Sequence, residues 1–197
     1  MPFPFYRRLS KAGKATYRKS DAIAEVALPE VETLRPLADR IRVALEADDR
    51  IAVEHACHAL VAAMCRALGV DPVSVRVLAS RPRSGGGELH GLYVREEGKR
   101  PYLQVWMRTA AHRQVVAFRT FLRTLLHEVG HHLDYELLAL DDSLHTEGFY
   151  RRESSMMRQL VPGSARRAKD AGETAAAVVE AKPEKRAKPE QITLPWR

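Results

Sequence analysis

A His-Glu-x-x-His pattern in the second half of the chain has the residue types and the spacing that metal-assisted hydrolysis needs. His127 and His131 are four residues apart, and Glu128 follows the first of them. A helical turn takes about 3.6 residues, so on a helix both imidazoles project from one face and can share a zinc ion. Glu128 would lie about 100° around that helix, where its carboxylate can take a proton from water that the metal activates. The pattern predicts a Zn²⁺ site with Glu128 as catalytic base.

An amphipathic helix is expected to carry this pattern, from about residue 113 to residue 138. Its apolar stripe consists of Val115, Phe118, Leu122, Leu125, Val129 and Leu133. The two histidines lie roughly opposite that stripe, together with Asp134. Asp134 could orient a ligand imidazole, or it could be an exposed helix residue. His132 lies off the ligand face and is interpreted as a surface residue or a neighbour of the ligands.

Residues 88–160 resemble the zincin metallopeptidases, and in detail the SprT-like branch of that family. In this branch a short loop after the active-site helix leads to a third zinc-binding His, which is followed after three residues by Phe. His145 and Phe149 fit this pattern, with thirteen residues between His131 and His145. The resemblance therefore implies that His145 is the third zinc ligand. The family usually has Gly directly after that His, whereas this chain has Thr146 there and Gly148 two places later.

Other side chains in the same region remain candidates for the third ligand or for positioning a ligand. A carboxylate takes the third place in gluzincins, and both Glu147 and Glu153 stand in the right region. Tyr150, Arg151 and Arg152 could stabilise an oxyanion, or they could be ordinary residues of a helix surface.

The flanking elements predict an α+β fold of the zincin type. We expect N-terminal helices, a small mainly antiparallel sheet, the His-Glu-x-x-His helix and a second ligand-bearing helix. The predicted elements are helices over 10–19, 34–45, 51–68 and 146–160, a strand over 73–78, a flexible loop over 81–87, and a hairpin of 89–95 with 102–108. The resemblance implies that the 101–108 strand is an edge strand on which an extended substrate pairs.

Charge is spread unevenly along the chain and suggests three segments. Residues 1–20 contain six Lys or Arg and no acidic residue, whereas 163–197 contain eight basic and five acidic residues without apolar periodicity. We therefore expect a basic N-terminal segment (1–20), a metallopeptidase domain (21–162) and a disordered tail (163–197). The start of the chain lacks the apolar region of a signal peptide and no apolar run is long enough to span a bilayer, so the expected location is the cytoplasm, without a membrane partner.

The two cysteines limit the kinds of metal site. Cys57 and Cys65 are eight residues apart in a predicted helix, too far apart along its axis to form a disulfide, and are expected to be reduced core residues. The sequence has no pair of cysteines with zinc-ligand spacing, so His, Asp or Glu must hold any zinc ion.

Together these features predict a zinc-dependent metalloendopeptidase that hydrolyses protein or peptide substrates. One alternative is a protein whose basic termini bind nucleic acid, since SprT-like proteins include proteases of DNA-bound proteins. Another is a catalytically silent scaffold that keeps the zinc site for folding. The intact Glu128 favours the enzyme.

Overall fold

The computed structural model describes residues 3–84 and 87–163. The described part contains five α-helices, one short 3-10 helix and five strands. Apart from Gly163, the predicted disordered tail lies outside the described residues. The fold class is α+β, as predicted.

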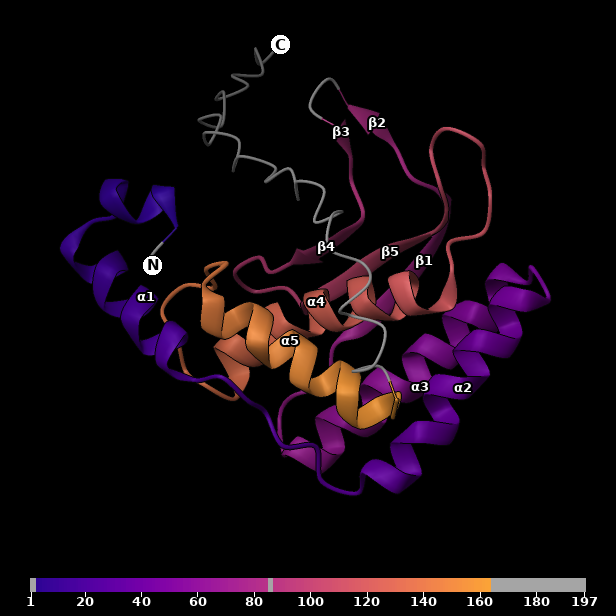
Figure 1. The fold of residues 1–197 in the computed structure, drawn as a ribbon, viewed down its shortest axis with the longest axis horizontal. Coiled ribbons are helices and arrows are strands. Elements are labelled where there is room, and N and C mark those ends of the chain that lie inside the picture. The colour runs from indigo at the N-terminus through magenta and orange to yellow at the C-terminus, as the bar shows by residue number, and fades with distance from the viewer. Residues whose placement is uncertain (1–2, 85–86, 164–197) are drawn as a thin grey trace, which may run out of the picture.

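The N-terminal half is helical. It contains η1 (Pro4–Arg8), α1 (Lys11–Ala22), α2 (Val31–Glu46) and α3 (Arg50–Leu68). Side chains at the starts of two helices satisfy free amide groups: Ser10 accepts a hydrogen bond from the Gly13 amide, and Asp49 accepts from the Ile51 and Ala52 amides. Helix α3 ends at Gly69, whose φ of 66° suits glycine. In Figure 1, α1 lies at one end of the molecule and α2 and α3 lie at the other.

The main sheet has three strands and is mixed rather than mainly antiparallel. Strands β1 (Ser74–Ser80), β4 (Gly91–Val94) and β5 (Tyr102–Arg108) have the order β1-β5-β4. β5 pairs with β4 in the antiparallel direction, which confirms the predicted hairpin, and it pairs with β1 in parallel.

The central place of β5 makes one sequence-based expectation wrong. The 101–108 strand was expected at an edge, but β5 has a neighbour on each side and β4 is an edge strand. The physical reason is burial: Leu103, Val105 and Met107 on one face are fully buried, and Trp106 on the other face is nearly so. A strand of this kind belongs in the middle of a sheet. The segment 81–87, which was predicted to be a flexible loop, also differs from the prediction. It takes part in a small hairpin of β2 (Arg83–Ser84) with β3 (Gly87–Glu88).

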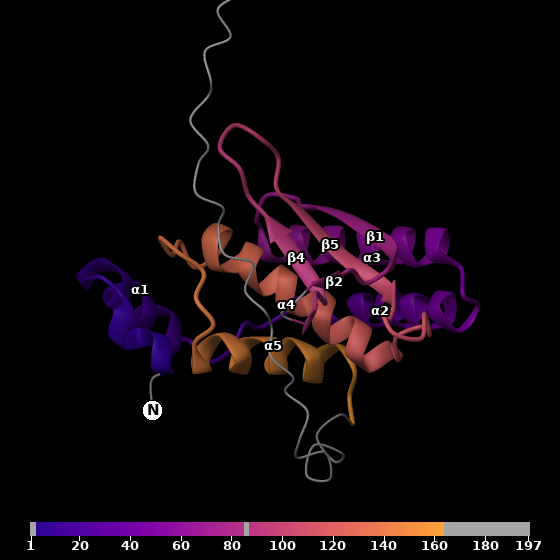
Figure 2. The same ribbon diagram turned by 90° about the horizontal axis from the view of Figure 1, so that it is seen from above.

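Helix α4 (Phe118–Glu136) lies between the sheet and α5 (Glu147–Leu160), as Figure 2 shows. It packs against β4 and β5 on one side and against α5 on the other. The helix begins later than predicted, because Val115 forms a β-bridge with Arg108 instead of joining the helical stripe. The His-Glu-x-x-His pattern therefore stands on a helix that is covered on two sides.

Helix α3 is long and apolar enough, by length and composition alone, to cross a membrane. In this fold, however, its apolar face packs against α2 and β1. The residues of that face, Val53, Ala56, Cys57, Leu60, Val61, Met64 and Cys65, belong to the main apolar core. The core therefore accounts for the apolar character of this helix.

Candidate metal centre

Three histidines from two segments of the fold come together at one point. His127 and His131 project from α4, and His145 lies in the loop just before α5. Their candidate ligand atoms all lie within 4.8 Å of one another. The Nε2 atom of His145 is 2.9 Å from Nε2 of His127 and 3.2 Å from Nε2 of His131. The structure thus brings together the three histidines that the sequence suggested as ligands, close enough to bind a metal ion.

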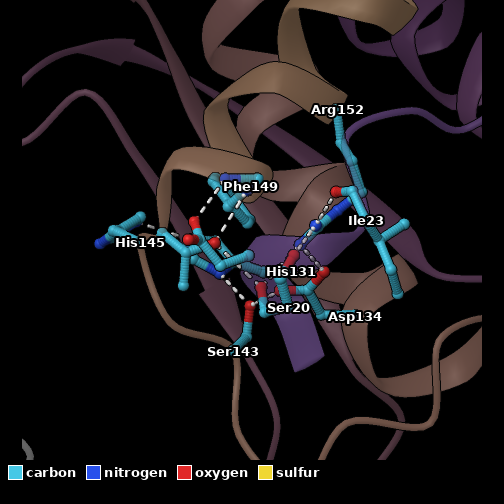
Figure 3. Close-up of polar contacts among 11 residues, drawn as sticks. Ser20, Ile23, His131, Asp134, Ser143, His145, Phe149 and Arg152 are labelled. Atoms are coloured by element: carbon cyan, nitrogen blue, oxygen red, sulfur yellow. Dashed lines mark hydrogen bonds and ion pairs between the residues drawn. The ribbon is translucent and has the colours of Figure 1, made fainter. Parts of the chain in front are cut away.

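The tautomers of two of these histidines follow from their partners. His127 Nδ1 is 3.0 Å from Glu153 Oε2, and an ionised carboxylate can only accept, so Nδ1 carries the proton. His131 Nδ1 is 2.7 Å from the Ser143 hydroxyl, which donates its own proton to Asp134 Oδ2 at 2.7 Å. The hydroxyl oxygen must then accept from His131 Nδ1–H. Both Nε2 atoms are therefore left with a lone pair, and each faces Nε2 of His145. Figure 3 shows the contact between His131 and Ser143.

The electrostatics of the cluster favour a neutral His131 imidazole. Burial lowers the pKa of His131 well below its usual value, and the neighbouring His127 and His145 lower it further. A neutral imidazole is the form that binds metal. Three imidazole nitrogens are the protein donor set of one class of catalytic zinc site, so the residues present fit Zn²⁺.

Phe149 forms an apolar wall beside the three imidazoles. Its ring centroid lies 4.9 Å from His127, 4.8 Å from His131 and 5.3 Å from His145. Gly130 makes this approach possible, because a Cβ at that position would lie 3.1 Å from the Phe149 ring. Gly130, within the His-Glu-x-x-His pattern, and Phe149, four residues after His145, therefore pack against each other.

Glu128 lies beside the cluster and points toward β4. Its side chain is buried, and this burial raises its pKa to about 7, against the opposing effect of His127. The space that it occupies exists because residue 91 is glycine: a Cβ there would lie 2.2 Å from Glu128 Oε1. A buried carboxylate with a pKa near neutrality can both take up and release a proton.

The other carboxylates of the region are not placed as ligands. Glu153 holds His127 Nδ1 and also accepts from Arg123 at 2.8 Å, so it positions a ligand. Glu147 is exposed and forms an ion pair with Arg151 on the surface of α5. Asp134 is fully buried, which excludes the exposed role, and it reaches His131 only through Ser143.

Sequence reasoning missed or misplaced several residues around the centre. Ser143 was not considered, although it lies two residues before His145 and carries a hydroxyl. His132 is fully buried, and its Nε2 lies 2.8 Å from the Asp71 carbonyl oxygen. Arg152 was interpreted as an oxyanion donor or a surface residue, but it is 2% exposed and its guanidinium binds Asp134. The ring of Tyr150 stacks on His145 at 5.8 Å between centroids.

No protein-family model matches the chain, and neither a curated protein nor a solved structure shows a significant similarity to it. The functional inference therefore depends on the geometry and chemistry of the centre.

Proposed function

We propose that the chain is a zinc-dependent metallopeptidase of the zincin type, with His127, His131 and His145 as ligands and Glu128 as general base. One observation carries the proposal: the nitrogen atoms of three imidazoles converge, two from α4 and one from the following loop. In His127 and His131 the partner of Nδ1 accepts its proton, so Nε2 keeps a free lone pair. Without a metal, a proton on His145 Nε2 could be donated fully to only one of these two lone pairs. The resemblance to SprT-like proteins agrees with this assignment, and it extends from β4 to α5.

In the proposed mechanism Glu128 moves the proton. Bound Zn²⁺ would supply a Lewis acid that lowers the pKa of a water molecule and polarises the substrate carbonyl. Glu128 takes a proton from the attacking water as the new C–O bond forms at the peptide carbon. It then gives that proton to the amide nitrogen as the C–N bond breaks. Glu153 and Ser143 accept the Nδ1 protons of His127 and His131, which leaves the Nε2 atom of each imidazole to hold the metal.

The position of β4 supports an extended peptide as substrate. β4 is an edge strand, and Gly91 in it lies directly against the Glu128 carboxylate. A peptide that adds to this edge by main-chain hydrogen bonds would place its carbonyl carbons beside Glu128. This assigns to β4 the role that the sequence had suggested for β5.

Glu128→Gln tests the proposal, with metal content and hydrolysis of an unstructured protein substrate measured together. Because the substitution removes a proton acceptor and no ligand, we expect bound Zn²⁺ at the wild-type ratio. Hydrolysis should fall by about 10² to 10⁴-fold, the range for loss of a general base. A variant that loses its zinc would make Glu128 a ligand, and full activity in the variant would contradict the mechanism. A wild-type protein that binds zinc but hydrolyses no protein substrate would favour the catalytically silent scaffold.

A second proposed function, nucleic-acid binding, is favoured by the exposed cations of η1 and α1. Arg7, Arg8, Lys11 and Arg18 are exposed, and the same segment reaches Tyr150 through Phe3, whose ring lies 6.1 Å away. A cationic surface next to the centre would bind DNA phosphates, and this would bring proteins bound to that DNA close to the centre as substrates. Replacing these four residues with Gln should weaken DNA binding and flatten its dependence on salt, while unchanged binding would reject this function.

A further inference from the structure

The C-terminal part of α1 contacts the loop that leads from α4 to α5. The Thr16 hydroxyl is 3.3 Å from Asp141 Oδ2, and Lys19 Nζ donates to the Ala139 carbonyl at 3.1 Å. The Ser20 and Thr146 hydroxyls are 3.1 Å apart, and both residues are fully buried. Ser143 and His145 belong to this loop, so three side chains of α1 contact the segment that contains a candidate ligand.

Arg152 connects the end of α1 to the His131 side of the centre (Figure 3). Its Nη1 donates to the carbonyls of Ser20 and Ile23, each at 2.6 Å, and its Nη2 donates to Asp134 Oδ1 at 2.7 Å. Asp134 in turn fixes Ser143, whose hydroxyl oxygen accepts from His131 Nδ1. A continuous chain of hydrogen bonds therefore runs from the end of α1 to a metal-binding imidazole.

The charges in this chain are buried and compensate each other. Arg152 is 2% exposed and Asp134 is fully buried. A buried carboxylate that lost its guanidinium partner would be costly to keep ionised, and once protonated it could donate to the Ser143 hydroxyl instead of accepting from it. Arg152 therefore favours the ionised Asp134 that accepts from Ser143, and with it the arrangement in which Ser143 accepts from His131 Nδ1.

Gly148 allows α1 to come this close. A Cβ at residue 148 would lie 2.4 Å from the Ser20 carbonyl oxygen and 2.6 Å from that of Asp21, which are backbone atoms. The Gly148 amide also donates to Asp21 Oδ1 at 3.0 Å, which places a carboxylate at the N-terminus of α5. Thr146, which stands where the family usually has Gly, and Gly148 both contact the end of α1.

We propose that the end of α1, Ser20 to Ile23, is a built-in part of the metal centre that positions His131 through Arg152 and His145 through Thr146. The proposal rests on the metal binding proposed above. No described residue of α1 belongs to the main apolar core. Its buried side chains Thr16, Tyr17 and Ser20 lie outside that core, so displacement of the helix opens no cavity in it.

Gly148→Ala in the full-length chain is the first test, with Zn²⁺ affinity measured by competition with a chromophoric chelator. The added methyl group must displace the backbone at Ser20, while Ala favours the helical conformation of α5 more than Gly does. We expect the Zn²⁺ dissociation constant to rise by about 10 to 100-fold, as is typical when a ligand loses the group that orients it. Gly13→Ala in α1 is the matched control: its Cβ would meet Leu9 at an ordinary 3.4 Å, and the affinity should not change.

Asp21→Ala is the second variant and decides the matter if Gly148→Ala does not fold. Its carboxylate binds the first turn of α5 rather than a histidine, so its loss loosens α1 and leaves the ligands intact. The visible absorption of the Co²⁺-loaded protein should change in both variants, because it reports the geometry of the ligands and not the stability of the fold. Hydrogen exchange of the α1 amides shows whether the helix has been released.

The outcomes separate this inference from the proposed function. A released α1 together with wild-type Zn²⁺ affinity and an unchanged Co²⁺ spectrum would overturn the positioning role and leave the metallopeptidase proposal intact. A wild-type chain that binds neither Zn²⁺ nor Co²⁺ would overturn both. Weaker binding in Gly148→Ala and Asp21→Ala, with Gly13→Ala unchanged, is the result that supports the role of α1.

Discussion

The three histidines of the centre are held in three different ways. A carboxylate, Glu153, holds His127 directly, whereas a hydroxyl group, Ser143, stands between His131 and its carboxylate Asp134. His145 depends on the backbone next to Thr146, which caps α5 by accepting from the Phe149 amide. Loss of a ligand and loss of a group that holds a ligand should therefore have different effects on metal binding.

Replacement of His145 and of Glu153 separates these roles. His145→Ala removes one of three ligands, so we expect it to lose Zn²⁺ under mild chelation. Glu153→Ala removes the acceptor of His127 Nδ1 and the partner of Arg123 but no proposed ligand, and it should retain Zn²⁺ with an affinity lowered by about 10 to 100-fold. Zinc content after dialysis against a weak chelator measures both. The opposite order of losses would make Glu153 the ligand and move the chain toward a gluzincin-like site.

At the level of elements, the fit between β4 and α4 determines where Glu128, the proposed general base, can lie. Gly91 in β4 pairs with Val105 of β5, and Glu128 projects from α4 into the space that a side chain at residue 91 would fill. The Tyr93 backbone amide of the same strand stabilises the ionised carboxylate. Residues of β4 and α4, which are far apart in the sequence, thus together determine the position of the Glu128 carboxylate.

Gly91→Ala tests this fit. The new Cβ would overlap the Glu128 carboxylate, which must turn away, and the three atoms nearest to that Cβ all belong to Glu128 rather than to a histidine. We expect Zn²⁺ binding to persist and hydrolysis to fall by about 10²-fold, the size of effect that a displacement of about 1 Å can produce. Gly13→Ala is again a suitable control, and activity equal to wild type in Gly91→Ala would show that Glu128 does not need this position.

At the level of the whole molecule, one apolar core joins α2, α3, α4, α5 and the sheet. Cys57 and Cys65 lie within it and are free thiols, as the sequence predicted. Burial raises the pKa of both thiols above the usual value, more strongly for Cys57. Since the thiolate is the reactive form, both cysteines should be protected in the folded chain.

Thiol titration can therefore follow unfolding of the core. We expect no rapid reaction of either cysteine with a thiol reagent at neutral pH in the native protein, and reaction of both in denaturant. Because desolvation is the cause of the raised pKa values, reactivity should appear at the same denaturant concentration as the loss of helical circular dichroism. Rapid labelling of one cysteine in the native state would contradict the placement of α3 in the core.

The sequence by itself determined the features that depend on local spacing. His127 and His131 share a face because four residues make about one helical turn, and the hairpin of β4 and β5 follows from two short apolar runs separated by a turn. Capping residues such as Ser10 were also predictable, because a cap acts on amides only two or three residues away. Such features need no information about distant parts of the chain.

Only the tertiary structure decided the features that depend on contacts between distant segments. The sequence allowed Glu153, Glu147 or His145 as third ligand and could not reveal that Ser143 stands between His131 and Asp134. The resemblance placed β5 at an edge, and local spacing could not correct this. The partner β1 is separated from β5 by more than twenty residues of the sequence. Arg152 looked like a residue of a helix surface, since its partners Asp134 and the end of α1 approach only when three helices pack together. Burial, unlike periodicity, is a property of the whole fold.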